Sequence, residues 1–249
     1  MNFNLGRNSM TRKGPFVSWF SAVVLVAACG LLLIACQQRP DAQSIRIGAH
    51  HARFIIAFLD ETGSRGPEWN DMVDRVAVVA GRLKNQDAFT VIGIDDHGGD
   101  EDDVRIPLTI VQTRSDLDMA GLKRQRDAIV AQVKSLKPRG KPQRTDIVGA
   151  IRQAQGMANK VSQNMNVILA FFSDMQQTPR MPDDAAMKDI HFPDGTVGYC
   201  FYVSASRRYD FPATVSLWQR LLTSAGVAIT ENDFHQKGTV DFGLNNAFR

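Results

Sequence analysis

Residues 54–64 read FIIAFLDETGS, and this stretch decides the fold. Its first six residues are apolar without polar alternation, a pattern typical of a strand that is covered on both faces of a parallel sheet. The run ends at Asp60, and Thr62 and Ser64 follow at alternate positions. Because ligands of open α/β sheets bind outside the carboxyl ends of the strands, these three oxygen-bearing side chains fall where such folds build their sites.

The rest of the chain alternates apolar runs of strand length with longer segments of helical period. This pattern predicts an α/β fold with a doubly wound, Rossmann-like, mainly parallel sheet and helices on both faces. The strand that follows residue 103 comes too soon after its predecessor for a helical crossover, so we expect it to be antiparallel and at an edge of the sheet. Helices are expected at residues 68–83, 117–136, 147–161 and 213–225, and further strands at residues 89–94, 104–111, 167–172, 197–203 and 227–230.

A second carboxylate and a third hydroxyl are expected near Asp60. Asp174 follows the apolar strand at residues 167–172, and Thr145 lies just before a helix. Together with Thr62 and Ser64 they would form an all-oxygen donor set, which suits Mg²⁺, or Mn²⁺, better than zinc or copper. The alternative interpretation is structural, because Asp, Ser and Thr also cap turns and helices at such positions.

The segment Asp60-Glu61-Thr62-Gly63-Ser64, with Thr145 and Asp174 further along the chain, resembles the metal-ion-dependent adhesion site of von Willebrand factor type A domains. The motif of that family is Asp-x-Ser-x-Ser, followed by a distant Thr and a distant Asp. The resemblance implies that Thr62, Ser64 and Thr145 contact a metal directly or through water. It also implies that Asp60 and Asp174 hold water ligands and supply the balancing charge.

This sequence departs from the family pattern at three positions. Thr62 replaces the usual first serine and keeps its hydroxyl, Arg65 follows Ser64 where an apolar residue is common, and Met175 follows Asp174 where a glycine is frequent. The changes bear on the affinity for a metal more than on the fold.

The first 35 residues resemble a bacterial lipoprotein signal peptide. Three basic residues precede a nearly continuous apolar run over residues 15–35, as in a secretory signal. The run ends in Leu33-Ile34-Ala35-Cys36, which resembles a lipobox, so Cys36 is the expected site of acylation, for example by palmitate. A lipobox ending at Cys29 is one alternative, and an uncleaved anchor helix is another, because roughly 20 apolar residues can span a bilayer.

Either form of the N-terminus places the domain outside the cytoplasm, because the positively charged flank stays inside. Three of the 29 Lys and Arg residues lie in the signal, and the remainder equals the 26 Asp and Glu residues. The processed chain is therefore close to neutral and gives no reason to expect a nucleic-acid partner. Gln37 follows Cys36 in place of the aspartate that favours inner-membrane retention in enteric bacteria, which favours the outer membrane.

The expected organisation is a signal peptide at residues 1–35, a tether at residues 36–49, a VWA-like domain at residues 50–235 and a C-terminal tail at residues 236–249. We expect a lipid-anchored module of the bacterial envelope that captures a protein partner, with an acidic side chain of the partner bound to the metal. A metal-independent accessory lipoprotein of a secretion or conjugation apparatus is the alternative. A hydrolase is disfavoured because the chain lacks a Gly-x-Ser-x-Gly elbow, so we do not expect an enzyme.

Two charged loops are expected near the site. The acidic loop at residues 95–103 lacks the spacing of a calcium-binding EF-hand and is interpreted as a solvated hairpin tip. The basic loop at residues 137–144 is expected beside the site, where it could attract carboxylates. Cys200 lies in an aromatic strand and should be a buried, inert thiol, and Trp218 should belong to the core face of its helix.

Overall fold

The strand that ends at Asp60 lies in the middle of a sheet. β1 (Arg53–Asp60) pairs in parallel with β2 (Ala88–Ile94) on one side and with β4 (Asn166–Phe172) on the other, and its residues are buried throughout. The computed structural model describes residues 51–62, 68–96, 99, 101–115, 117–139, 144–161, 165–205 and 210–249. The predicted signal peptide, the tether and Cys36 lie outside the described residues.

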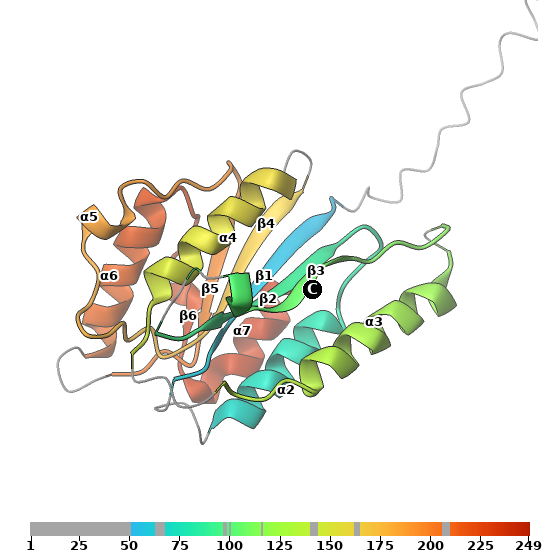
Figure 1. Cartoon of the computed structure of the whole chain (residues 1–249), viewed down its shortest axis with the longest axis horizontal. Helices are drawn as coiled ribbons and strands as arrows, with labels where there is room; N and C mark the ends of the chain where they lie inside the picture. Colours follow the sequence, from blue (N-terminus) through green and yellow to red (C-terminus); the bar gives the residue numbers. More distant parts are fainter. Residues whose placement is uncertain are drawn as a thin grey trace, which may run out of the picture. The chain divides into compact units, whose positions relative to one another are not determined.

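The described strands form one sheet in the order β3-β2-β1-β4-β5-β6 (Figure 1). β3 (Val104–Ile110) is antiparallel to β2 and lies at the edge, which confirms the prediction made from its short connection. β5 (Val197–Phe201) and the short β6 (Phe234–His235) continue the sheet in parallel on the other side. The fold is therefore the mainly parallel α/β architecture that the sequence predicted.

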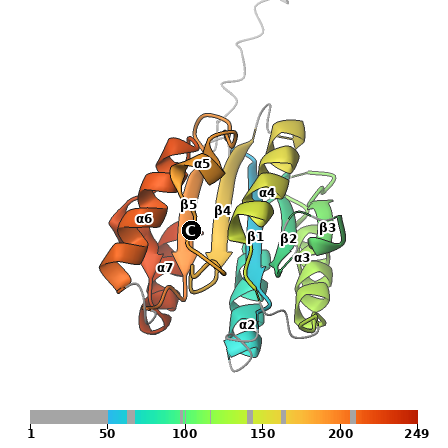
Figure 2. The ribbon, with the colours of Figure 1, turned by 60° about the vertical axis from the view of Figure 1, so that its left-hand side comes forward.

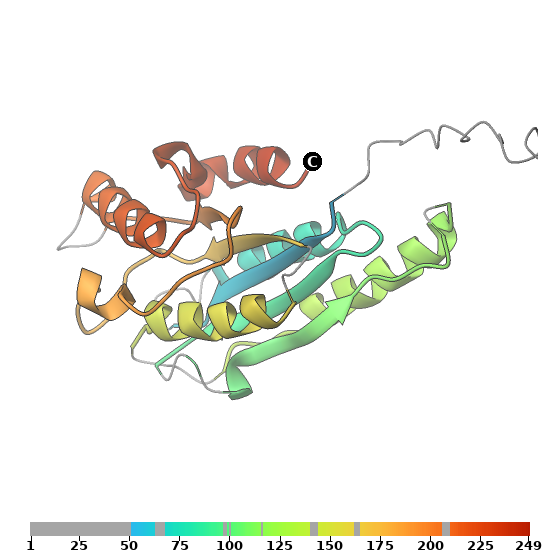
Figure 3. The same cartoon turned by 90° about the horizontal axis from the view of Figure 1, so that it is seen from above.

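Helices cover both faces of the sheet (Figures 2 and 3). Because side chains alternate along a strand, β1 contributes Phe58 to a hydrophobic cluster with α4 and α6, and Leu59 to a second cluster with α2, α3 and α7. The helix bounds are α2 (Trp69–Ala80), α3 (Met119–Lys134), α4 (Ile147–Val161), α5 (Asp184–Met187), α6 (Phe211–Ser224) and α7 (Val240–Ala247). Within the described parts of the chain, no helix is both long and apolar enough to cross a bilayer.

The last part of the chain differs from the prediction. The strand expected at residues 227–230 is reduced to an isolated bridge between Ala228 and Val197, and the sheet is completed by β6 further along. The segment at residues 236–249, predicted to be a tail, instead carries a 3₁₀ turn (Lys237–Thr239) and α7. Its apolar residues Val240, Leu244 and Phe248 recur at every fourth position and are buried against the sheet, so the domain extends to the end of the chain.

Two further predictions about the core are confirmed. Cys200 is fully buried, and burial raises the pKa of its thiol well above the usual value. Trp218 is also fully buried in α6, and its indole N–H donates a 2.7 Å hydrogen bond to the carbonyl of Met175. This bond ties α6 to the loop after β4, which carries part of the candidate site.

Candidate metal centre

The two carboxylates predicted to form the site lie at the ends of neighbouring strands. Asp60 is the last residue of β1, and Asp174 follows the end of β4 by two residues. The two strands are parallel, with Leu59 opposite Phe172 in their register, so their carboxyl ends lie side by side. Asp60 is fully buried and Asp174 is only 6% exposed. Just before the two strands end, the rings of Phe58 on β1 and Phe171 on β4 stack with their centroids 4.2 Å apart, which packs the neighbouring strands together.

Both carboxylate oxygens of Asp60 are held by hydrogen bonds. Its Oδ1 accepts bonds from the Thr62 N–H at 3.0 Å and from the Thr62 hydroxyl at 2.7 Å. Its Oδ2 accepts a 2.7 Å bond from the hydroxyl of Ser173, which lies between the end of β4 and Asp174. Sequence reasoning missed Ser173 as a site residue, although its position between a strand end and a predicted ligand was visible.

The surroundings of Asp60 disfavour its negative charge. Burial is the main cause and the charge of Asp174 is the next, and together they raise the pKa of Asp60 from 3.8 to about 6, against the opposing effect of the hydrogen bonds from Thr62 and Ser173. Two carboxylates at one buried strand edge gain stability from a cation placed between them. This is the electrostatic situation that a bound metal ion would relieve.

The loop after β4 holds Asp174 in a fixed turn. Asp174 Oδ1 accepts a 2.9 Å bond from the Gln176 N–H, and the side chain of Gln176 donates to the Ser204 carbonyl and the Thr214 hydroxyl. Met175 between them has φ = 60°, the left-handed region that favours glycine. The glycine common at this position in the family would suit the backbone that the chain adopts here. In this chain Met175 takes that position, and its side chain is fully buried in the hydrophobic cluster with α4 and α6.

Thr145 is placed beside the same loop. Its N–H donates to the Thr178 hydroxyl at 2.8 Å, and its carbonyl accepts the Thr178 N–H at 3.1 Å. The helix cap is Asp146, whose Oδ1 accepts a 3.0 Å bond from the Gly149 N–H, so Thr145 does not serve as the N-cap of α4. The Thr145 hydroxyl forms no hydrogen bond with the described part of the chain although the residue is only 5% exposed. It is therefore available as a ligand.

Four of the five predicted ligands belong to described residues, namely Asp60, Thr62, Thr145 and Asp174. Ser64 lies outside them, with the rest of residues 63–67. Among the described residues, no three His, Cys, Asp or Glu side chains are grouped so that they could hold a metal. A metal at this edge would therefore depend on hydroxyl ligands as well as the two carboxylates. Such oxygen donors suit Mg²⁺ or Mn²⁺.

Glu61, which follows Asp60, connects the site to the edge strand and to the basic loop. Its side chain is buried and pairs with the guanidinium of Arg105 on β3. Its Oε2 also accepts a 2.8 Å bond from the N–H of Arg139, within the loop at residues 137–144. The described start of the basic loop therefore lies beside the residue next to Asp60, where the sequence placed it.

The acidic loop is solvated at its described tip, as predicted, where Asp96, Gly99 and Asp102 are exposed, but its last residue is buried. Asp103 is only 3% exposed and accepts a 3.0 Å bond from the Gly99 N–H. Its other oxygen lies 3.6 Å from the guanidinium of Arg139. Positions 97, 98 and 100 lie outside the described residues. The end of the acidic loop at Asp103 therefore lies beside the basic loop at Arg139, where the opposite charges attract.

Comparison with known structures identifies the fold. A von Willebrand factor type A protein from Catenulispora acidiphila matches with a TM-score of 0.51 at 13% identity, over 78% of this chain and 41% of that one. Proximal thread matrix protein 1 from the mussel byssus, solved with zinc in its adhesion-site motif, gives a TM-score of 0.47 at 14% identity, over 79% of this chain and 46% of that one. This chain thus spans less than half the length of these proteins. No family model and no curated protein sequence matches significantly.

The match to the Catenulispora protein, together with the sheet order and the antiparallel edge strand, shows the fold of von Willebrand factor type A domains. At such low identity it shows the fold alone. The chemistry of the site is argued from the residues of this chain.

Proposed function

We propose that this chain is a lipid-anchored binding module of the bacterial envelope, which captures a protein partner through a divalent cation. The cation would be Mg²⁺ or Mn²⁺, held by Asp60, Thr62, Ser64, Thr145 and Asp174. The observation that carries the proposal is the buried carboxylate pair of Asp60 and Asp174 at the carboxyl edge of adjacent strands, with the pKa of Asp60 raised to about 6.

Each described residue has a role that follows from its place in the fold. Asp60 and Asp174 supply the negative charge, and the hydrogen bonds from Thr62 and Ser173 fix the orientation of the Asp60 carboxylate. Thr145 offers a hydroxyl without a described hydrogen-bond partner. When bound, a hard cation of this kind supplies an exchangeable coordination position that an acidic side chain of a partner could occupy.

The membrane part of the proposal rests on the sequence. The apolar run that ends in Leu33-Ile34-Ala35-Cys36 supports acylation of Cys36 and a domain held outside the cytoplasm, with the outer membrane favoured by Gln37. The test is to label cells with radioactive palmitate and compare wild type with Cys36→Ala. Label and membrane association that both depend on Cys36 support the lipid anchor. Membrane association without label in either chain assigns the segment to an uncleaved anchor helix.

A metal-independent scaffold is the second candidate, and one observation favours it. Thr62 and Ser173 already satisfy both oxygens of Asp60 by hydrogen bonds, so the site has a stable arrangement within the chain itself. The fold would then serve an accessory role in a secretion or conjugation apparatus through other surfaces. We propose a binding role and no catalysis in either case.

Capture of envelope proteins separates the two candidates. Detergent-solubilised envelope proteins are passed over immobilised wild-type chain in Mg²⁺, and bound proteins are eluted with EDTA. The metal-dependent function predicts a set that elutes with EDTA, is absent from Asp174→Asn and is retained by Asp127→Asn, which removes one exposed carboxylate from α3. A set that resists EDTA and binds all three chains equally would contradict metal-dependent capture and support the scaffold.

A further inference from the structure

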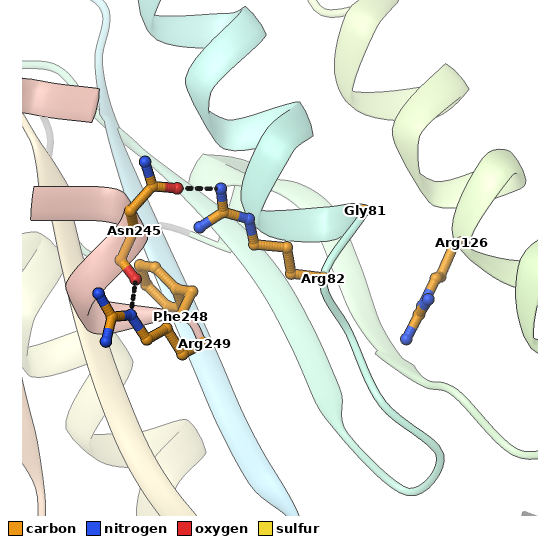
Figure 4. Close-up of a pocket in the computed structure, with 6 residues that line it drawn as sticks. All are labelled: Gly81, Arg82, Arg126, Asn245, Phe248 and Arg249. Carbon is orange, nitrogen blue, oxygen red and sulfur yellow. Dashed lines mark hydrogen bonds between the residues drawn. The ribbon is translucent and has the colours of Figure 1, made fainter. Parts of the chain in front are cut away.

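A pocket lined by arginines, drawn in Figure 4, lies near Arg53 at the start of β1, whereas the candidate metal centre lies at the end of that strand. It has a volume of about 630 Å³ and opens between the end of α2, α3 and the end of α7. α2 begins after the loop that carries Thr62 and runs back along the sheet, so its end at Ala80 lies near the amino ends of the strands. The lining residues are Gly81, Arg82, Arg126, Asn245, Phe248 and Arg249.

In the part of the chain that the structure describes, no side-chain carboxylate pairs with the three guanidinium groups of this arginine pocket. Within the described residues, Arg82, Arg126 and Arg249 form no ion pair, and all their hydrogen bonds go to neutral acceptors. Elsewhere in the domain, buried or half-buried arginines do pair with acids, as Arg53 does with Asp87 and Arg105 with Glu61. The pocket therefore brings together three guanidinium groups that no described side-chain carboxylate neutralises.

Hydrogen bonds hold these arginines in place. Arg82 donates to the Leu244 carbonyl at 2.8 Å and to Asn245 Oδ1 at 2.6 Å. Arg249 Nε donates to the Asn245 carbonyl at 3.1 Å, and Arg126 donates through Nε to the Leu83 carbonyl. Figure 4 shows Arg126 extending from α3 toward the segment after α2, with Arg82 between it and α7. Each guanidinium keeps further N–H donors for a ligand, in the planar arrangement that suits phosphate oxygens.

The pocket lies where the chain enters the domain. Arg53, the first residue of β1, donates a 3.1 Å bond from its guanidinium to the carbonyl of Arg82. Sixteen residues, 37–52, separate Cys36 from this strand, and even fully extended they reach no more than about 55 Å. A membrane anchor at Cys36 would therefore keep this end of the domain near the lipid headgroups.

We propose that the arginine pocket binds phosphate groups, and that the headgroups of anionic phospholipids supply them. The inference rests on the proposed lipid anchor for its orientation but does not depend on the metal centre. It gives the domain two ends with different tasks: the amino ends of the strands face the membrane, and the carboxyl ends, with Asp60 and Asp174, face the partner. Anionic surfaces attract basic residues within about a Debye length, and attachment at Cys36 would raise the local concentration of the pocket at such a surface.

The test uses residues 37–249, because both hydrophobic clusters are built from residues beyond position 53 and lose nothing when the signal is removed. Its binding to vesicles of phosphatidylglycerol and of phosphatidylcholine is measured by co-sedimentation. The pocket variant Arg126→Gln/Arg249→Gln spares Arg82, which holds α7. The control Arg152→Gln/Lys188→Gln removes the same charge from exposed positions, with Arg152 on α4 across the sheet. Thermal unfolding by circular dichroism verifies that all chains are folded.

The proposal predicts binding to phosphatidylglycerol vesicles and much weaker binding to phosphatidylcholine. Each basic residue near an anionic surface contributes about fivefold to partitioning, so the pocket variant should bind about 25-fold more weakly. The control variant should bind within about threefold of the wild type, as expected for charges remote from the surface.

A second experiment titrates glycerol 3-phosphate into the protein in solution and follows the amide chemical shifts of the protein. Saturable shifts near Arg126 without vesicle binding would retain the phosphate site and assign it to a soluble ligand, overturning the headgroup as its source. The phosphate site itself would be overturned if the pocket and control variants lost vesicle binding equally. It would also be overturned if the wild type bound neither the vesicles nor glycerol 3-phosphate. Asp60→Asn should bind vesicles like the wild type, so failure of the metal proposal leaves this result unaffected.

Discussion

The hydroxyl of Ser173 donates a 2.7 Å hydrogen bond to Asp60 Oδ2 and so joins the carboxyl end of β4 to that of β1. The same Ser173 oxygen accepts a 3.0 Å bond from the Met175 N–H, which shapes the turn that carries Asp174. One buried side chain therefore orients one carboxylate and positions the loop of the other. This relationship explains how two like charges are held at one strand edge.

Ser173→Ala should destabilise the domain, because Asp60 loses a donor and the buried Met175 N–H loses its acceptor. We expect the free energy of unfolding to fall by about 1–3 kcal/mol, measured by urea denaturation in metal-depleted buffer. Ser224→Ala is the matched control, since its hydroxyl bonds to the Leu221 carbonyl at the exposed end of α6, and its effect should stay within about 0.5 kcal/mol. Equal effects of the two substitutions would contradict a structural role for Ser173.

The stability of the metal-free domain should fall as the pH rises from about 4 to about 6. Asp60 has its pKa raised from 3.8 to about 6 by burial and by Asp174, so the folded state binds this proton more tightly than the unfolded chain does. The stabilisation is complete below the unfolded pKa and is lost as the pH passes the folded one. The full effect is at most about 3 kcal/mol.

Urea denaturation of wild type and Asp60→Asn across this pH interval isolates the contribution of Asp60. In Asp60→Asn, the unfolding free energy should lack the decrease with pH that the Asp60 carboxyl causes. Addition of Mg²⁺ should flatten the wild-type slope, because the cation favours the ionised form. A wild type that gains stability relative to Asp60→Asn over the interval would refute the raised pKa.

Arg105→Met should destabilise the domain strongly, because it leaves the buried carboxylate of Glu61 without its ion-pair partner. Breaking a buried ion pair by removing one partner costs about 3–5 kcal/mol. The double variant Arg105→Met/Glu61→Leu removes the stranded charge and should recover a large part of that loss. Additive effects in this double-mutant cycle, measured by chemical denaturation, would show that the pair is not coupled.

Leu244→Ala tests whether α7 belongs to the domain. Leu244 is only 1% exposed in the cluster with α2 and α3, whereas Phe242 on the same helix is 68% exposed. The first truncation should cost about 2–4 kcal/mol of unfolding free energy, and Phe242→Ala should cost less than about 1 kcal/mol. If Leu244→Ala and Phe242→Ala both lowered the unfolding free energy by similar small amounts, the segment at residues 236–249 would be a tail rather than part of the domain.

The central strands were predictable because they carry their signal in consecutive residues. β1 and β4 are unbroken apolar runs that end near Asp60 and Asp174, so both the parallel core and the edge that carries the carboxylates follow from the sequence. The antiparallel β3 followed from a connection too short for a helix. These features depend on local pattern and chain length alone.

Features that depend on tertiary contacts were missed. α7 is short, and the apolar residues Val240, Leu244 and Phe248 mark a buried face only where the sheet lies beside them. The run at residues 227–230 has strand composition, but only Ala228 pairs with the backbone of β5, in an isolated bridge to Val197. Ser173 reads as an ordinary loop residue until the two strands are placed side by side. In each case the deciding partner is distant in sequence.

Calorimetric titration of Mg²⁺ into metal-depleted residues 37–249 at neutral pH tests the central claim most directly. The account predicts binding of about one ion per chain by the wild type and by Asp127→Asn, and no binding by Asp60→Asn, because the adhesion-type site holds a single cation. Absence of binding by the folded wild type, or equal binding by Asp60→Asn, would contradict a metal centre at this edge of the sheet.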